Sequence, residues 1–170
     1  SIMKLLFLGD SLIEFYDWQA RFSEHEVTNA GQAGETVAGL FANLPQLLRR
    51  CPNPDRVFVM IGTNNLLMED YGFLPDYERI LACLVSILAP ERIVITGLPP
   101  FLAEHLAPSV IPCMNAGLLK LSQEKKTAFL DLFSGFNTDT KSVAACFTED
   151  GVHLSCIGYA IWSARLASNL

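Results

Sequence analysis

Short apolar runs alternate with helical patterns five times along this chain of 170 residues. The clearest run is Arg56–Ile61, which is rich in β-branched and aromatic residues and ends at a glycine. Runs of this kind indicate strands that are buried on both faces, as in parallel sheets. Strands that alternate with helices predict an α/β fold, a three-layer sandwich around a five-stranded parallel sheet of order 2-1-3-4-5. The expected strands are Lys4–Leu8, Glu26–Asn29, Arg56–Ile61, Arg92–Thr96 and Thr127–Asp131.

Apolar residues at helical spacing predict two long helices. The first covers Val37–Leu48, and Pro45 within it predicts a kink or a break. The second covers Tyr77–Leu88 and is ended by Pro90. Shorter helical segments are expected over 12–19, over 114–124 and from about 155 onward, and an irregular segment is expected over 132–150.

Composition limits the classes of function. Hydrophobic residues make up 51% of the chain, which is enough for one domain, residues 1–170, with a substantial core. The net charge is −6 and the basic residues are not clustered, which argues against a nucleic-acid partner or an anionic membrane surface. No apolar stretch is long enough to span a membrane, so we expect no membrane insertion. The five cysteines include no Cys-x-x-Cys pair, and this usage predicts reduced thiols in a cytoplasmic protein.

The first apolar run ends at Gly9, Asp10 and Ser11 and then passes into a helical pattern. A serine in this turn lies at the carboxyl edge of the predicted sheet, where open α/β sheets bind their ligands. The position suits a nucleophile, which also needs a base and an oxyanion hole. A simpler interpretation is that Asp10 or Ser11 caps the helix, since both residue types are favoured at N-caps.

Three further loops carry groups that are suited to acyl chemistry. The third strand ends near Asn64, whose amide can donate to an oxyanion, and the loop after the second strand contains Gly34, whose N–H has no side chain beside it. Before the last helix, Asp150 and His153 are spaced so that the carboxylate can orient the imidazole. Each of these residues could instead be a turn or structural residue. Because these loops meet at one edge of a parallel sheet, the joint pattern predicts a single catalytic site.

The same four segments match the motifs of a known family. The chain resembles the GDSL, or SGNH, hydrolases over almost its whole length. It looks closest to the compact single-domain members related to platelet-activating-factor acetylhydrolase subunits. The matching blocks are Gly9–Leu12, Asn29–Thr36, Gly62–Asn65 and Asp150–Leu154. Two positions depart from the pattern, since Asn65 stands where many members have Asp and Glu35 stands where Asp is frequent.

The resemblance implies hydrolysis of an ester or thioester without a cofactor and without a metal. It implies that Ser11 is the nucleophile, that His153 is its base and that Asp150 is the partner of His153. The N–H groups of Ser11 and Gly34 and the side chain of Asn64 would form the oxyanion hole. The expected partner is a small-molecule ester or thioester. The sequence leaves open the acyl group, the leaving group and the oligomeric state, a homodimer included.

Apolar residues in the same loops are candidates for the walls of a substrate cleft. They are Phe15, Tyr16, Leu66 and Phe101. The alternative is that these side chains belong to the core, as aromatic residues commonly do. No insertion is large enough to form a lid, so the walls predict a shallow cleft that favours short acyl groups.

Three other functions were weighed against hydrolysis. An acyltransferase would use the same site and pass the acyl group to an alcohol, and the sequence does not separate the two. A non-catalytic, flavodoxin-like binding module would need a phosphate loop after the first strand, but the residues after Ser11 are apolar and include a carboxylate. A metallohydrolase is disfavoured because the three histidines have no metal-ligand spacing.

Overall fold

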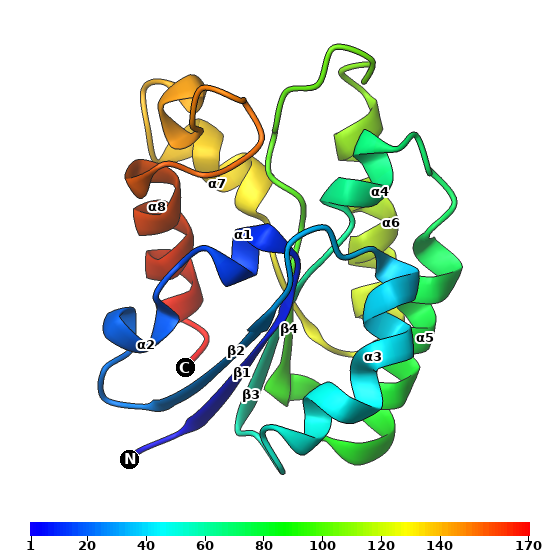
Figure 1. Ribbon diagram of the computed structural model, residues 1–170, viewed down its shortest axis with the longest axis vertical. Coiled ribbons are helices and arrows are strands. Elements are labelled where there is room, and N and C mark those ends of the chain that lie inside the picture. Colours follow the sequence, from blue (N-terminus) through cyan, green and yellow to red (C-terminus); the bar gives the residue numbers. More distant parts are fainter.

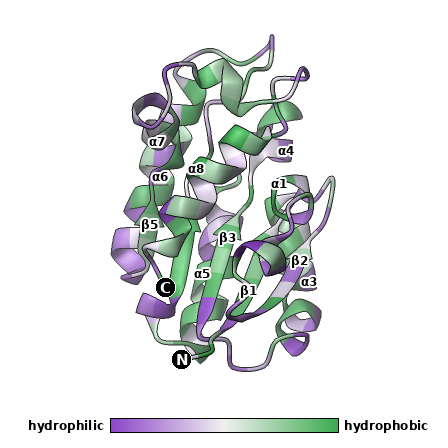
Figure 2. Ribbon diagram, turned by 90° about the vertical axis from the view of Figure 1, so that its left-hand side faces the viewer, coloured by the Kyte–Doolittle hydropathy of each residue, from purple (hydrophilic) through white to green (hydrophobic).

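Five parallel strands form one sheet in the computed structural model, which describes residues 1–170 (Figure 1). The strands are β1 (Lys4–Gly9), β2 (Glu26–Gly31), β3 (Arg56–Met60), β4 (Ile93–Thr96) and β5 (Ala128–Leu130). Their order is β2-β1-β3-β4-β5, which confirms the order predicted from the sequence. Figure 2 shows green, the colour of hydrophobic residues, along much of β3, as expected for a strand covered on both faces.

Helices cover both faces of the sheet and complete three layers (Figure 1). One face carries α3 (Val37–Arg49), α5 (Leu74–Ile87) and α6 (Val110–Lys125). The other face carries α2 (Trp18–Arg21), α7 (Leu132–Thr138) and α8 (Cys156–Ala167). The short helices α1 (Ser11–Glu14) and α4 (Thr63–Leu67) follow β1 and β3, and the 3₁₀ turns η1 and η2 span Pro90–Arg92 and Val143–Cys146. None of the helices combines the length and the apolar composition needed to cross a membrane.

Helix α3 continues through Pro45, so the expected break does not occur. A proline inside a helix removes one backbone hydrogen bond and crowds the preceding turn. The helix buries Val37, Leu40 and Leu44 against the rest of the fold. Packing of an apolar face contributes most of the stability of protein helices, and here it outweighs the local cost of the proline.

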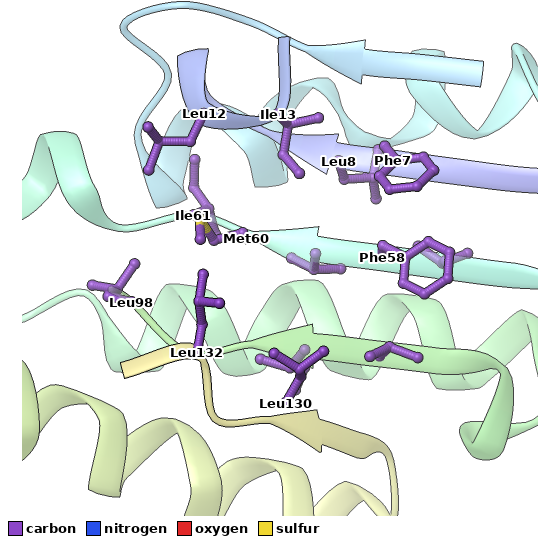
Figure 3. Close-up of a cluster of buried hydrophobic side chains, with 14 of the residues drawn as sticks. Phe7, Leu8, Leu12, Ile13, Phe58, Met60, Ile61, Leu98, Leu130 and Leu132 are labelled. Atoms are coloured by element: carbon purple, nitrogen blue, oxygen red, sulfur yellow. The ribbon is translucent and has the colours of Figure 1, made fainter. Parts of the chain in front are cut away.

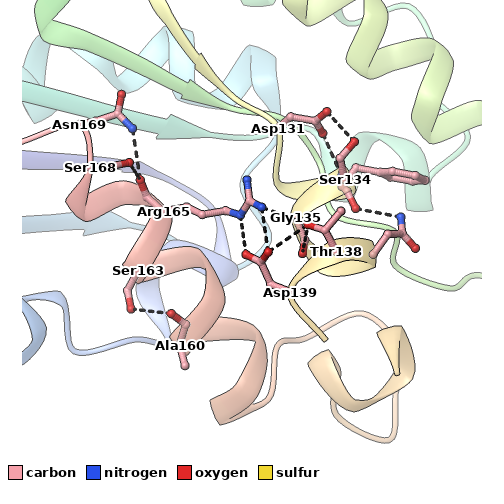
Figure 4. A network of polar contacts seen from close by, with 12 residues as sticks. Asp131, Ser134, Gly135, Thr138, Asp139, Ala160, Ser163, Arg165, Ser168 and Asn169 are labelled. Atoms are coloured by element: carbon pink, nitrogen blue, oxygen red, sulfur yellow. Dashed lines mark hydrogen bonds and ion pairs between the residues drawn. The ribbon is translucent and has the colours of Figure 1, made fainter. Parts of the chain in front are cut away.

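The segment 132–150 is more regular than expected, because it contains α7 and η2. Asp131 caps α7 by accepting a hydrogen bond of 3.0 Å from the N–H of Ser134. Arg165 of α8 then holds the end of α7 through two hydrogen bonds to the carboxylate of Asp139, of 2.8 and 3.1 Å (Figure 4). This contact lowers the pKa of Asp139. It also joins α7 to α8, the two helices on either side of the segment that contains the last loop.

A cluster of 42 buried hydrophobic residues fills the space around the sheet. Phe7 of β1 lies at its centre, with ring centroids 4.5 Å from Trp18 and 4.8 Å from Phe58. Figure 3 shows Phe7 and Phe58 side by side on neighbouring strands. Trp18 in turn packs edge-on against Trp162 of α8, whose indole N–H donates to Thr96. The aromatic residues therefore join β1, α2, β3 and α8 into one packed unit.

Gly9 allows the end of β1 to approach its neighbours closely. A Cβ atom at this position would lie 2.2 Å from the carbonyl oxygen of Met60 and 2.5 Å from the side chain of Ile13. Both distances are far shorter than a van der Waals contact, so only glycine fits between β3 and α1. Since Ser11 follows two residues later, this close packing also sets where its side chain begins.

We expect Gly9→Ala to lower the free energy of unfolding by about 2 kcal/mol or more, because the added methyl group meets backbone that cannot move aside. Gly72→Ala is the matched control, since the nearest atom to a Cβ there is 3.8 Å away. Urea denaturation of both variants measures the difference. Equal stability of the two variants would contradict the close packing at Gly9.

Candidate active site

Ser11 is the first residue of α1 and follows directly from the end of β1. Asp10 caps this helix by accepting a hydrogen bond of 3.0 Å from the N–H of Leu12. The hydroxyl of Ser11 is therefore placed at the carboxyl edge of the sheet, where its Oγ lies 3.1 Å from Nε2 of His153. The two interpretations of this turn apply to different residues. Asp10 is the helix cap, and Ser11 carries the hydroxyl that faces His153.

His153 is held by Asp150 in the loop before α8. Oδ2 of Asp150 lies 2.6 Å from Nδ1 of His153. The other oxygen, Oδ1, accepts hydrogen bonds of 2.9 Å from the N–H groups of Val152 and His153. It also accepts a hydrogen bond of 2.8 Å from the hydroxyl of Thr148. These hydrogen bonds hold the pKa of Asp150 well below its usual value, and the bond from the imidazole has the largest effect. An ionised carboxylate only accepts, so Nδ1 carries a hydrogen and the neutral ring presents Nε2 as an acceptor to Ser11.

Two further donors predicted from the sequence lie in neighbouring loops. Asn64 in α4 donates one amide hydrogen to the carbonyl oxygen of Glu35 at 2.9 Å, which leaves its second hydrogen free to donate elsewhere. Gly34 precedes Glu35 and has a φ of +83°, a conformation that favours glycine. Its N–H makes no hydrogen bond within the protein. The bond from Asn64 therefore ties the two donors to each other.

The glycine-bearing loop is also tied to the turn that carries Ser11. The N–H of Gln32 donates to the carbonyl oxygen of Gly9 at 3.0 Å, and the N–H of Ala33 donates to the carboxylate of Glu14 at 2.7 Å. Asn29 adds three bonds of 3.2 to 3.3 Å from its amide to carbonyl oxygens at and just beyond the end of α1. These positioning residues were missed by the sequence analysis, although Asn29 and Gln32 lie inside one of the four motif blocks.

Asn65 has a structural reason to differ from the aspartate that is frequent in the resembled family. It is 3% exposed, and its side-chain oxygen accepts a hydrogen bond from the N–H of Val37 at the start of α3. Its side-chain nitrogen donates to the carboxylate of Asp70 at 2.9 Å. A carboxylate at this position could not donate, and it would face a second carboxylate. The amide therefore links α3, α4 and the segment that follows α4.

Asp10 is the second carboxylate near Ser11, and it is almost completely buried. Only one of its oxygens is hydrogen-bonded, and Oδ2 has no partner. Burial raises the pKa of Asp10 to about 7, although the N–H of Leu12 partly opposes this shift. The group thus differs sharply from the exposed Asp150, whose hydrogen bonds keep it ionised at neutral pH.

The four residues expected to line the substrate cleft occupy different environments. Phe15 is 56% exposed, and its ring centroid lies 5.5 Å from that of His153. Tyr16 is partly buried and stacks on Tyr159 with a centroid distance of 4.5 Å. Leu66 is fully buried in the core, so the expectation that its side chain lines a cleft is wrong. Leu66 lies on the inward face of the short helix α4, in a region where the sequence predicts only a connection.

Phe101 lies beside the candidate site without touching it. It is 3% exposed and lines an apolar cavity of about 230 Å³ between the segment that follows β4 and α7. Leu102 lines the same cavity, and its N–H donates to the carbonyl oxygen of Gly151 in the loop that holds His153. The side chains of Asp150 and His153 are 50% and 37% exposed, and neither they nor Ser11 line any of the four cavities.

Comparison with known proteins identifies the family. The family model of the GDSL-like lipase/acylhydrolases matches residues 7–161. The chain belongs to this family. The resemblance predicted from the four motif blocks is thereby confirmed, and acylhydrolase activity is the activity of the family. No curated protein sequence matches the chain.

Solved structures of several other proteins share the fold. A lipase/acylhydrolase from Enterococcus faecalis matches with a TM-score of 0.84 at 17% identity, over 98% of this chain and 94% of that chain. A putative platelet activating factor from Streptococcus pneumonia matches with a TM-score of 0.82 at 23% identity, over 99% and 84%. Axe2, an acetylxylan esterase from Geobacillus stearothermophilus, matches with a TM-score of 0.77 at 22% identity, over 99% and 94%. At these identities the likeness shows the fold alone.

Asp10 should make the stability of the protein depend on pH. Its pKa is higher in the folded protein, at about 7, than its ordinary value of 3.8, so the folded state binds this proton more tightly. The resulting stabilisation is complete below about pH 4 and is lost as the pH rises through about 7. Between these values we expect the free energy of unfolding to fall by about 3 to 4 kcal/mol relative to Asp10→Asn, which keeps the acceptor for Leu12 but does not titrate.

Urea denaturation of both proteins across this pH range measures the effect. Parallel pH curves for the two proteins would show that Asp10 does not titrate in the folded state.

Proposed function

We propose that this protein is a serine acylhydrolase that cleaves small acyl esters through an acyl-enzyme on Ser11. The observation that carries the proposal is the unbroken row of contacts from the hydroxyl of Ser11 to His153 at 3.1 Å and from His153 to Asp150 at 2.6 Å. A serine hydroxyl becomes an effective nucleophile when an adjacent base takes its proton and a third group orients that base. Membership of the GDSL-like family supports this assignment.

Acylation begins when Nε2 of His153 accepts the proton of the Ser11 hydroxyl and Oγ bonds to the carbonyl carbon of the ester. The carbonyl oxygen becomes an oxyanion, and the N–H groups of Ser11 and Gly34 and the free amide hydrogen of Asn64 stabilise it. The C–O bond to the alcohol then breaks, and the imidazolium gives its proton to the leaving oxygen. Water attacks the acyl-enzyme by the same route, which releases the acid and restores Ser11.

Asp150 supports proton transfer by His153 at neutral pH. Its low pKa means that it stays ionised, so it holds the hydrogen on Nδ1 and stabilises the imidazolium while His153 carries two protons. The carboxylate is itself oriented by the backbone N–H groups of Val152 and His153, so its geometry does not depend on the substrate. Asp150 thus orients the imidazole of His153 and stabilises its positive charge. The proton that moves passes from Ser11 to His153.

Labelling with a fluorophosphonate probe tests the proposed nucleophile. We expect the probe to modify Ser11 of the wild type, as seen by peptide mapping, and we expect no labelling and almost no ester hydrolysis in Ser11→Ala. Ser134→Ala is the matched control, because Ser134 also lies in the first turn of a helix but bonds to Asp131 instead of a histidine. Full ester hydrolysis by Ser11→Ala would rule out the proposed mechanism.

The open site predicts a preference for short acyl groups. The side chains of Asp150 and His153 are 50% and 37% exposed, so an acyl chain beside them stays in contact with water after its first few carbons. Each methylene contributes about 0.8 kcal/mol only while it is removed from water. We therefore expect higher kcat/KM for acetyl to hexanoyl esters of p-nitrophenol than for longer ones, assayed below their aggregation limits. A value that still rises beyond about ten carbons would reveal an acyl channel instead.

A further inference from the structure

Phe15 is an exposed aromatic residue with a specific neighbour. Phe15 is 56% exposed, so more than half of its surface remains in contact with solvent. The only aromatic ring beside it is the imidazole of His153, with a centroid distance of 5.5 Å and an angle of 32° between the rings. The contact with His153 is therefore the one aromatic contact that Phe15 makes in the fold.

The backbone of Phe15 is fixed relative to the serine. Its N–H donates to the carbonyl oxygen of Ser11 at 2.9 Å and ends α1. The amide of Asn29 bonds the carbonyl oxygens of Glu14 and Tyr16, the residues on either side of Phe15. The phenyl ring is therefore presented from a rigid segment whose position depends on Ser11.

The ring restricts a motion of His153 that the hydrogen bonds leave free. Asp150 bonds Nδ1 and Ser11 bonds Nε2, and these two nitrogens lie on opposite sides of the imidazole. Bonds at two ends of a ring prevent it from sliding in its plane but allow rotation about the line that joins them. The phenyl ring of Phe15, with its centroid 5.5 Å away and tilted by 32°, restricts that rotation, and an aromatic ring also favours a neighbouring cation.

We propose that Phe15 is a positioning residue that holds the imidazole of His153 in line between Asp150 and Ser11 and stabilises its protonated form. The proposal rests on the function proposed above, because the imidazolium forms when His153 accepts the proton of Ser11. The alternative is that Phe15 is a wall of the substrate cleft, as the sequence also suggests. A wall acts on KM according to the acyl group, whereas a positioning residue acts on kcat and on its pH dependence.

The test compares Phe15→Leu, which removes the ring, with Phe15→Tyr, which keeps it. We expect Phe15→Leu to lower kcat about two- to fivefold for acetyl and hexanoyl esters alike and to move the acid limb of the kcat profile to lower pH by about half a unit. Phe15→Tyr should keep both kcat and the acid limb of the kcat profile at their wild-type values. Asp150 and Asp10, the ionisable groups coupled to His153, are unchanged in both variants.

Tyr71→Leu is the matched control, since Tyr71 is an exposed aromatic residue in the connection after β3, at the same edge of the sheet. It should leave kcat and the acid limb at their wild-type values. A Phe15→Leu variant that changes only KM, and changes it according to acyl length, would overturn the proposal in favour of a substrate wall.

An NMR titration of the His153 ring signals separates this proposal from the proposed function, because it needs no turnover. In Ser11→Ala, the additional change Phe15→Leu should move the midpoint of these signals to lower pH. If that shift occurs while the wild type hydrolyses no ester, the contact with Phe15 stands and the proposed function fails. If the wild type is an esterase and the midpoint does not move, the proposal for Phe15 fails alone.

Discussion

The register of the three central strands governs the rest of the site. Gly9 of β1 pairs with Gly31 of β2 on one side and with Met60 of β3 on the other, so the three strands end at the same level. The chain then turns out of the sheet at three adjacent points, and the loops that carry Ser11, Gly34 and Asn64 begin side by side. The close approach at Gly9 is part of the same constraint, because a side chain there would push β3 and α1 apart.

Amide side chains convert this shared edge into a rigid site. Asn29 holds the end of α1, Asn64 bonds the loop after β2, and Asn65 joins α3 to the segment after α4. An amide suits such positions because it can donate and accept at once and carries no charge that burial would penalise. Asp10 is the exception, since it is a buried acid whose ionisation opposes folding. The loops are thus held chiefly by amide groups, together with hydrogen bonds to the carboxylates of Glu14 and Asp70.

Most of the sheet could be predicted from the sequence because β1, β3, β4 and β5 are mainly apolar runs, whereas β2 contains Glu26, Thr28 and Asn29 and gives only a weak strand signal. The meeting of the four motif loops could be predicted because parallel strands share an edge. It was less informative where tertiary packing outweighs a local signal. Pro45 does not break α3, since the helix buries its apolar face. For Leu66 the sequence leaves both a cleft wall and a core position open, and α4, which no periodic pattern reveals, turns the side chain into the core. The direction in which Phe15 points depends on α1 and Asn29 together, and such a direction is not encoded in any short motif.

The hydrogen bond between Ser11 and His153 joins residues that are 142 positions apart in the chain. During synthesis, Ser11 therefore emerges long before His153, and four of the five strands and most of the helices are made in the interval. Domains fold as units once their chain is available, and contacts of such long range close late. The hydroxyl of Ser11 consequently has no histidine beside it until the segment with α7 and α8 has docked. Local opening of that segment alone would likewise separate Ser11 from His153 while the sheet remains folded.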